Sequence, residues 1–167
     1  FKFVKRYNGN IRVYLKSSGK IYKSTKKINQ SLRIEKLEIN KIKTFQKKVN
    51  KWKLNKKKQI EKITEKFGPL PAKAFPGRAS ISINLLGLNS QHISKVYEKN
   101  SSLKVNKFIP GTDIKILKEK YFKVKQHDKG ILINLAWHIS DEINNYLRQK
   151  MKFKGKIIDI ISNSDFK

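Results

Sequence analysis

The 167-residue sequence contains no cysteine, which excludes disulfide bonds, a cysteine-based zinc site, an iron–sulfur cluster and a thiol nucleophile. It has no apolar run near the roughly 20 residues of a membrane span and no signal-peptide pattern. We therefore expect a soluble, cytoplasmic protein. Acidic residues are also scarce, at 12 against 40 lysines and arginines. A hydrophobic content of 38% nevertheless suits a globular chain of one domain, or one domain plus an appendage.

The formal net charge of +28 is unevenly distributed and consists almost entirely of lysine. Residues 1–66 carry 22 basic and 4 acidic side chains, whereas the remaining residues carry 18 and 8. Clustered cations attract a phosphate backbone, but arginine, which forks onto phosphates and guanine edges, occurs at only five positions. We favour compositional bias on solvated faces as the explanation. Nonspecific polyanion affinity and dedicated nucleic-acid binding stay open as alternatives.

Residues 1–15 predict two strands joined by an Asn-Gly turn at residues 8–9. After the turn, Ile11, Val13 and Leu15 alternate in the period of a strand, on one face. A hairpin of this kind is not stable alone in water, so it should complete a sheet that another segment supplies. The chain also begins inside this strand and without Met, so we expect that a longer protein continues upstream.

Residues 28–66 predict a basic helical connector of two helices or one long broken helix. Apolar residues recur there at helical spacing between lysines, at Phe45, Val49, Trp52, Ile60 and Ile63. Such a helix could bind nucleic acid or a membrane surface. Alternatively, it is a linker helix whose apolar stripe packs on a neighbouring domain. We favour the linker, because the stripe is interrupted near residues 54–59 and the polar face lacks arginine.

From residue 67 onward the lysine density falls, and short apolar runs alternate with loops that contain glycine and proline. Strands are predicted at residues 72–75, 96–98, 114–116, 130–137 and 156–161, and helices at 81–86 and 140–151, the second with Ser140 as its cap. Strands that alternate with helices imply right-handed crossovers and an open, mostly parallel sheet. The fold class expected is therefore α/β.

The turn after the first strand of this sheet is the best candidate for a ligand site, because ligands bind outside the carboxyl ends of parallel strands. There Gly77 would let the backbone approach a ligand, Arg78 offers a cationic fork and Ser80 a hydroxyl. Glu98 ends the next strand, where it could hold a ribose or sugar hydroxyl, and His138 follows a later strand end. The alternatives are a turn that merely requires glycine and a cap, and an ordinary histidine.

No metal site and no catalytic group are predicted. The histidines are His92, His127 and His138, and none forms a metal-spaced pair with another histidine or an acid. No Ser/His/Asp order stands out, and the acids are too sparse to propose a carboxylate pair.

Three stretches together resemble the C-terminal part of the sugar C-methyltransferase family, SAM-dependent enzymes that methylate a carbon of nucleotide-linked deoxysugars. Residues 8–14 (NGNIRVY) are similar to the family's Gly-Gly-Ser-Leu-Arg-Val-Tyr strand. Residues 109–116 (IPGTDIKI) are similar to its Leu-Pro-Gly-Thr-His-Ile-Pro-Ile segment, and residues 135–143 (LAWHISDEI) to its Pro-Trp-Asn-Phe-Ala-Asp-Glu-Ile segment. Residues 74–86 and 96–100 match a Tyr-Gly-Ala-type strand and helix and a Val-Asp-Arg-Asn-type strand. These segments occur in the same order as in the family, over almost the whole chain.

The resemblance implies a Rossmann-like domain at residues 67–167, preceded by the connector at 28–66 and, at 1–27, by the last hairpin of a SAM-binding domain. The family's SAM-binding glycine motif and its Tyr-His-Glu-His catalytic stretch would lie before Phe1. SAM is therefore expected in that upstream domain and no cofactor in this chain. Its partners would be the upstream domain and a nucleotide-sugar ligand, with no membrane and only nonspecific contact to nucleic acid.

We accordingly expect the substrate-side domain of a SAM-dependent methyltransferase, which does not methylate alone. Two other functions stay open. One is a nucleic-acid-binding protein that uses the basic helix at residues 41–66. The other is a structural module that joins domains through Phe45, Val49 and Trp52.

Overall fold

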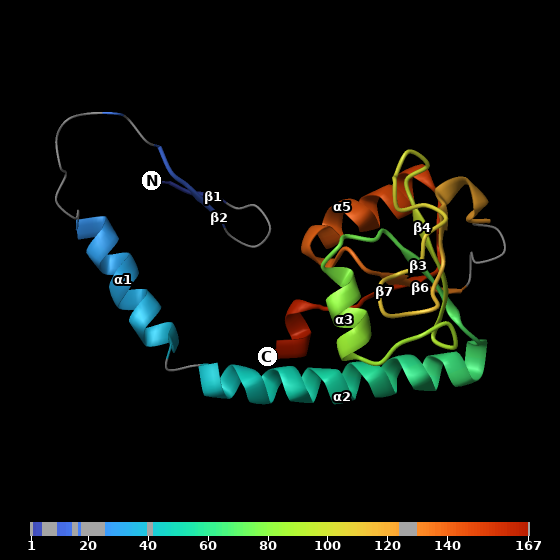
Figure 1. Ribbon diagram of the computed structural model, residues 1–167, viewed down its shortest axis with the longest axis horizontal. Helices are drawn as coiled ribbons and strands as arrows, with labels where there is room; N and C mark the ends of the chain where they lie inside the picture. The colour runs from blue at the N-terminus through green and yellow to red at the C-terminus, as the bar shows by residue number, and fades with distance from the viewer. Residues whose placement is uncertain are drawn as a thin grey trace. The chain divides into compact units, whose positions relative to one another are not determined.

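The computed structural model of the protein describes residues 2–4, 10–14, 17, 26–39, 42–123 and 130–166 (Figure 1). The chain divides into two compact units, residues 1–50 and 51–167. The first unit contains β1 (Lys2–Val4), β2 (Asn10–Arg12), α1 (Lys26–Ile39) and the start of α2 (Ile42–Phe67). The boundary thus falls inside α2, within the segment that the sequence assigns to the connector.

β1 and β2 form an antiparallel hairpin in which Lys2 pairs with Arg12 and Phe3 with Ile11. The expected Asn-Gly turn at residues 8–9 and Leu15 lie outside the described residues. Two apolar side chains of the expected face, Ile11 and Val13, are exposed.

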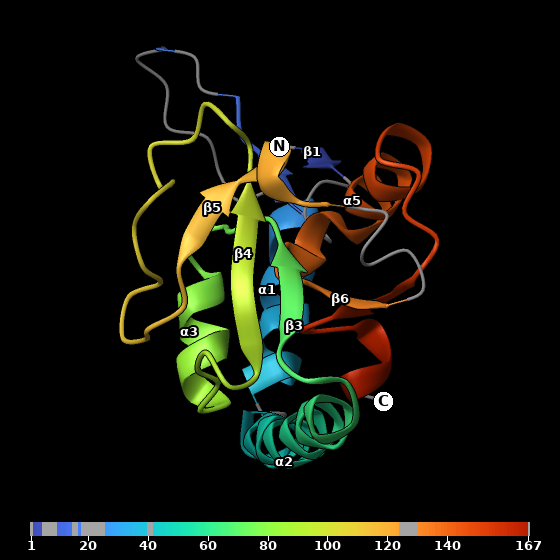
Figure 2. The same cartoon turned by 90° about the vertical axis from the view of Figure 1, so that its right-hand side faces the viewer.

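The second unit contains a sheet of five parallel strands in the order β5-β4-β3-β6-β7. Figure 2 labels β5, β4, β3 and β6 of this sheet. The strands are β3 (Leu70–Lys73), β4 (Ile93–Glu98), β5 (Ile116–Lys118), β6 (Ile131–Asn134) and β7 (Lys156–Asp159). Counted along the chain, this order is 3-2-1-4-5, the order of doubly wound dinucleotide-binding folds. The predicted Rossmann-like α/β class is confirmed. Because successive strands run outward from β3 on one side and from β6 on the other, the switch point lies between these two strands.

Helical segments lie between the strands of the second unit and after its last strand. They are α3 (Ala79–Leu85), η1 (Glu119–Tyr121), η2 (Trp137–Ile139), α5 (Ser140–Asn145), η3 (Tyr146–Lys150) and η4 (Asn163–Phe166). The helix predicted at residues 140–151 is therefore an α-helix that continues as a π-helix from Tyr146. Ser140 does not cap it as expected, because its hydroxyl donates instead to Asp159 Oδ2 at 2.6 Å.

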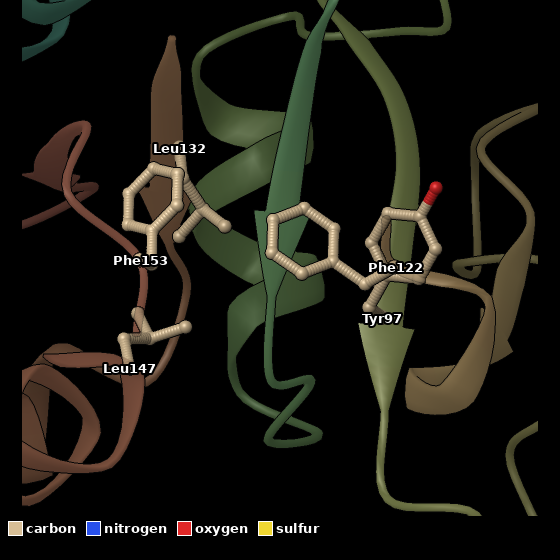
Figure 3. Close-up of a cluster of buried hydrophobic side chains, with 5 residues drawn as sticks. All are labelled: Tyr97, Phe122, Leu132, Leu147 and Phe153. Carbon is tan, nitrogen blue, oxygen red and sulfur yellow. The ribbon is translucent and has the colours of Figure 1, made fainter. Parts of the chain in front are cut away.

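An aromatic cluster fills one face of the sheet (Figure 3). The ring of Phe122 lies between Tyr97 of β4, at a centroid distance of 5.0 Å, and Phe153, at 6.1 Å. Leu132 of β6 and Leu147 of η3 complete the buried cluster. Because side chains alternate along a strand, the neighbouring buried residues of β4 and β6 face the other side of the sheet. Both faces are therefore buried, as the near-continuous apolar run at residues 131–136 predicts.

The part of α2 that belongs to the second unit packs on the end of the chain. Trp52 and Ile60 are buried, and Trp52 Nε1 donates to the Ile160 carbonyl at 3.3 Å. Between them on the same helix face lies Lys56, which is also buried and forms an ion pair with Asp165 at 3.1 Å. The interruption of the apolar stripe is thus occupied by a paired lysine. No helix in the described part of the chain has the length and apolar character needed to cross a membrane.

Candidate functional site

A pocket of about 390 Å³ lies where the strands of the sheet end at their carboxyl termini. Residues that directly follow β3, β4 and β6 line it, together with Glu119 after β5 and the first turns of α5. The lining residues are Lys73, Ala74, Phe75, Pro76, Glu98, Lys99, Lys104, Glu119, Ala136, His138, Ile139, Glu142, Ile143 and Tyr146. This is the position beside a topological switch point at which open α/β sheets bind ligands. We call it the carboxyl-end pocket.

A buried ion pair forms one wall of the carboxyl-end pocket. Lys73, the last residue of β3, is 3% exposed, and its Nζ lies 2.9 Å from Glu119 Oε1. The same ammonium stands 5.5 Å from the ring centroid of Tyr146. A charge taken out of water this far requires such a partner, because burying it alone costs several kcal/mol. The pair therefore fixes the ends of β3 and β5 relative to each other.

Tyr146 joins this wall at the point where α5 changes to a π-helix. Burial raises the pKa of its hydroxyl above the usual value of 10.0, and a hydrogen bond to Glu119 and that carboxylate's negative charge raise the pKa further. The phenol therefore stays protonated at neutral pH and donates to Glu119. Single π-helical turns inside α-helices occur frequently at functional sites.

The residue that directly follows β3 has an unusual backbone conformation. Ala74 has a φ of 59°, in the left-handed region that residues other than glycine rarely adopt. Next to it, the Phe75 amide donates to Glu98 Oε2 at 2.7 Å, and the Phe75 carbonyl accepts a bond of 2.7 Å from Lys104 Nζ. The Lys104 ammonium also lies 5.6 Å from the Phe75 ring centroid. The end of β4, through Glu98, and the loop between β4 and β5, through Lys104, therefore hold this turn at the pocket.

His138 lies in the short 3-10 helix between β6 and α5. Burial lowers the pKa of its imidazole below 6.5, and the positive charge of Arg78 lowers the pKa further, whereas Glu142 acts in the opposite direction. His138 is therefore neutral at neutral pH, and a neutral imidazole offers one donor and one acceptor.

The five residues predicted from the sequence separate into two groups. Glu98 and His138 line the carboxyl-end pocket, and both come from strand ends as expected. Gly77 and Arg78 lie in the turn between β3 and α3, Ser80 lies in the first turn of α3, and none of the three is among the lining residues.

The Ser80 hydroxyl, in the first turn of α3, donates to the Gly77 carbonyl at 2.8 Å. A Cβ placed on Gly77 would meet no atom within 4 Å. The left-handed residue in this connection is Ala74, three positions earlier. Arg78 is exposed, close enough to His138 for its charge to act on the imidazole.

Sequence reasoning missed Lys73, Glu119 and Tyr146. A lysine at the end of a buried strand was a usable signal, because buried lysines require a partner. Nothing in the sequence points to Glu119 as that partner, since 45 residues of chain separate the two.

The segment at residues 109–116 has a structural role. Asn84 Nδ2 on α3 donates to the Pro110 carbonyl at 2.9 Å. Gly111 has a φ of +77°, and a Cβ there would lie 2.4 Å from Asn84 Oδ1. Asp113 accepts hydrogen bonds from the amide and hydroxyl of Ser90, and these bonds lower the pKa of its carboxyl. The segment therefore fastens the β4–β5 connection to α3.

Among the described residues, no group of three or more histidine, aspartate or glutamate side chains is placed to hold a metal ion. His127 lies outside the described residues. The polar lining residues of the carboxyl-end pocket are three lysines, three glutamates, Tyr146 and His138, and its other lining residues are apolar.

Comparison with known proteins gives a family for this arrangement. No curated protein matches the chain. The family model for the C-methyltransferase C-terminal domain matches residues 6–161, which include the hairpin strand β2, all of α2 and the complete parallel sheet. The resemblance inferred from the sequence is confirmed, and the chain belongs to the C-methyltransferase C-terminal domain family.

Proposed function

We propose that this chain is the substrate-side domain of a SAM-dependent methyltransferase and that its carboxyl-end pocket receives part of a nucleotide-sugar acceptor. The observation that carries the proposal is the position of the pocket, beside the switch point between β3 and β6. Its composition also supports a binding role, because a few polar groups converge in a largely apolar cavity.

In this proposal the methyl donor binds elsewhere. Methyl transfer requires that donor and acceptor meet in line, and a pocket of about 390 Å³ is near the lower end of the roughly 300–1,000 Å³ typical of ligand sites. It suits part of one ligand rather than two. SAM would therefore be bound by an upstream domain of the same protein, and the chain alone would not methylate.

Individual residues have separate roles in the proposal. Glu98 and His138 would contact the acceptor inside the pocket, where the neutral imidazole can donate or accept a hydrogen bond. Arg78, on the exposed turn with Gly77, would contact a phosphate of the nucleotide, with the Ser80 hydroxyl in the adjoining first turn of α3.

Isothermal titration of the 167-residue chain tests the proposal. We expect heat of binding with a nucleoside-diphosphate deoxysugar and none with SAM. His138→Leu should weaken the binding several-fold, because leucine can neither donate nor accept the hydrogen bond. The matched control is His92→Leu, because His92 precedes β4 at the opposite end of the strand from the pocket. Tight SAM binding by this chain would contradict the division of labour. Unchanged affinity for the nucleotide sugar in Arg78→Ala would show that Arg78 does not contact a phosphate.

A second candidate rests on the exposed lysines of α2. Lys51, Lys58 and Lys62 are exposed on the side opposite Trp52 and Ile60. Such a row attracts polyanions without sequence preference. We propose that any nucleic-acid contact is of this nonspecific kind.

A cytoplasmic location also belongs to the proposal, and microscopy of the tagged full-length protein tests it.

A further inference from the structure

A short turn carries His138 to the carboxyl-end pocket, and two side chains outside the pocket hold both ends of this turn. The turn is the 3-10 helix η2, which lies between the end of β6 and the start of α5. His138 and Ile139 line the pocket from η2. Glu142 and Ile143 line it from α5, which begins directly after η2. This side of the pocket therefore depends on where η2 lies.

The first end of the turn is held by Asn134, the last residue of β6, which is completely buried. Its Oδ1 accepts a hydrogen bond of 2.9 Å from the amide of Ala136, the residue that directly precedes η2. Its Nδ2 donates to Asp159 Oδ1 at 2.7 Å. Turning this side-chain amide over would set a donor against the Ala136 amide and an acceptor against the carboxylate. The Asn134 side chain therefore has one orientation.

The second end of the turn is held by Asp159, the last residue of β7. Its Oδ2 accepts a hydrogen bond of 2.6 Å from the hydroxyl of Ser140, the first residue of α5. Asn144, one helical turn later, donates to the Ser140 carbonyl at 2.8 Å and to the Ser140 hydroxyl oxygen at 3.0 Å. The bonded pair of Asn134 and Asp159 therefore reaches the residue before η2 and the residue after it.

The backbone that carries the Asp159 carboxylate is itself held by α2. Lys56 Nζ donates to the Asp159 carbonyl at 3.2 Å, and Trp52 Nε1 donates to the Ile160 carbonyl at 3.3 Å. The two hydrogen bonds that the carboxylate accepts are charge-assisted, and such bonds are roughly twice as strong as those between neutral groups. A fixed support with strong bonds is what a group that positions another side chain requires.

We propose that Asn134 and Asp159 are positioning residues, which hold His138 at the carboxyl-end pocket by fixing both ends of η2. Neither residue lines the pocket, so they act through the turn and not on a ligand. The inference goes beyond the proposed function, because it concerns the protein alone and holds for any ligand. Its test needs no ligand, so its failure is distinguishable from failure of the proposed function.

NMR titration of the histidine ring protons in the 167-residue chain tests the proposal. Burial lowers the pKa of His138 below 6.5, so this pKa reports whether the imidazole keeps its place. Arg78 and Glu142, the charged groups that act on the imidazole, stay unchanged in every variant. The His138 signals are those that His138→Leu removes. His92, which precedes β4 at the opposite end of the strand from the pocket, gives a reference in the same spectrum.

The main variant is Ser140→Ala, which removes the hydroxyl that binds Asp159 and changes no charge. The matched control is Ser162→Ala, also after a strand end, whose hydroxyl is hydrogen-bonded to that of Ser164 at 2.8 Å. A second variant, Asp159→Ala, removes both acceptors at once. Loss of the negative charge would by itself lower the pKa of His138, so a rise in this variant does not come from the lost charge. Circular dichroism melting verifies that each variant folds.

We expect the pKa of His138 to rise toward 6.5 in Ser140→Ala and further in Asp159→Ala, because an imidazole that leaves its place regains contact with water. It should not change in Ser162→Ala, and the pKa of His92 should not change in any variant. An unchanged pKa of His138 in Ser140→Ala, whatever the melting temperature, would overturn the proposal, because the pair would then support the fold without positioning the imidazole. This comparison decides even if Asp159→Ala does not fold. An equal rise in Ser162→Ala would overturn the proposal as well.

Discussion

The ammonium of Lys73 and the carboxylate of Glu119 face each other at 2.9 Å, with side chains only 4% and 13% exposed. This ion pair joins β3 to the residue that follows β5, across the intervening strand β4. It is also part of the wall of the carboxyl-end pocket, so the fold and the site depend on the same contact.

Replacing Lys73 by Met should lower the free energy of unfolding by about 3–5 kcal/mol, because Glu119 is left as an uncompensated buried charge. The double variant Lys73→Met/Glu119→Gln should recover part of that loss. Urea denaturation of the full chain measures both. The control is Lys57→Met, whose ion pair with Glu61 is exposed and contributes about 0–1 kcal/mol. An equal, small effect of both single variants would show that the buried pair does not stabilise the fold.

Replacement by alanine should have different effects on stability at Gly155 and at Gly77. A Cβ on Gly155 would lie 2.3 Å from the Gly130 carbonyl oxygen, so Gly155→Ala should destabilise the chain by about 1–3 kcal/mol. Gly77 has open space and no left-handed φ, so Gly77→Ala should be neutral or should stabilise by up to about 1 kcal/mol through the unfolded state. Thermal unfolding compares the two. A loss of stability in Gly77→Ala would contradict the open environment of that turn.

The exposed lysines of α2 should govern any affinity for polyanions. Lys58→Gln/Lys62→Gln should weaken binding to a random DNA duplex and reduce the salt slope by about one per lysine removed. Fluorescence anisotropy at several salt concentrations measures this. The control pair is Lys107→Gln/Lys115→Gln, also exposed but outside α2. An equal loss in both pairs would mean that net charge, rather than the helix, sets the affinity.

The imidazole of His138 should titrate below 6.5 and respond in opposite directions to its two charged neighbours. Arg78→Gln removes a positive charge and should raise the pKa of His138, whereas Glu142→Gln should lower it. NMR titration of the ring protons measures each value. A fall, or no change, in Arg78→Gln would show that the two groups do not interact.

The lowered pKa of His138 also predicts how the stability of the fold changes with pH. A histidine whose pKa is lowered in the fold stabilises fully above the unfolded value of 6.5, and this contribution is lost as pH falls through the lowered pKa. His138→Gln should therefore lose less stability than the unmodified chain between about pH 7 and pH 5. Urea midpoints at the two pH values give this comparison.

Local patterns predict the order of the strands and helices, although the strand expected at residues 114–116 overlaps β5 (Ile116–Lys118) at one residue only. Spatial pairing explains what the patterns miss. The apolar run at residues 131–136 predicts β6 because a parallel strand is buried on both faces. Periodicity fails at Lys56, since a lysine in an apolar stripe reads as an interruption, although Asp165 makes it a buried member of the stripe.

The candidate site was accessible to sequence reasoning only in part. Glu98 and His138 were predicted from their places after strands, because strand ends converge at one edge of a parallel sheet. Lys73, Glu119 and Tyr146 meet through long-range packing, which no spacing along the chain encodes. The turn at Gly77, in contrast, has a sequence typical of a ligand loop and lies outside the pocket lining.

Both backbone polar groups of Phe75 are hydrogen-bonded, the amide to Glu98 and the carbonyl to Lys104. A loop fixed in this way has little conformational entropy left to lose when a ligand arrives. Association at the pocket should therefore proceed as a rigid fit, in which affinity reflects the contacts formed rather than the cost of ordering the receptor.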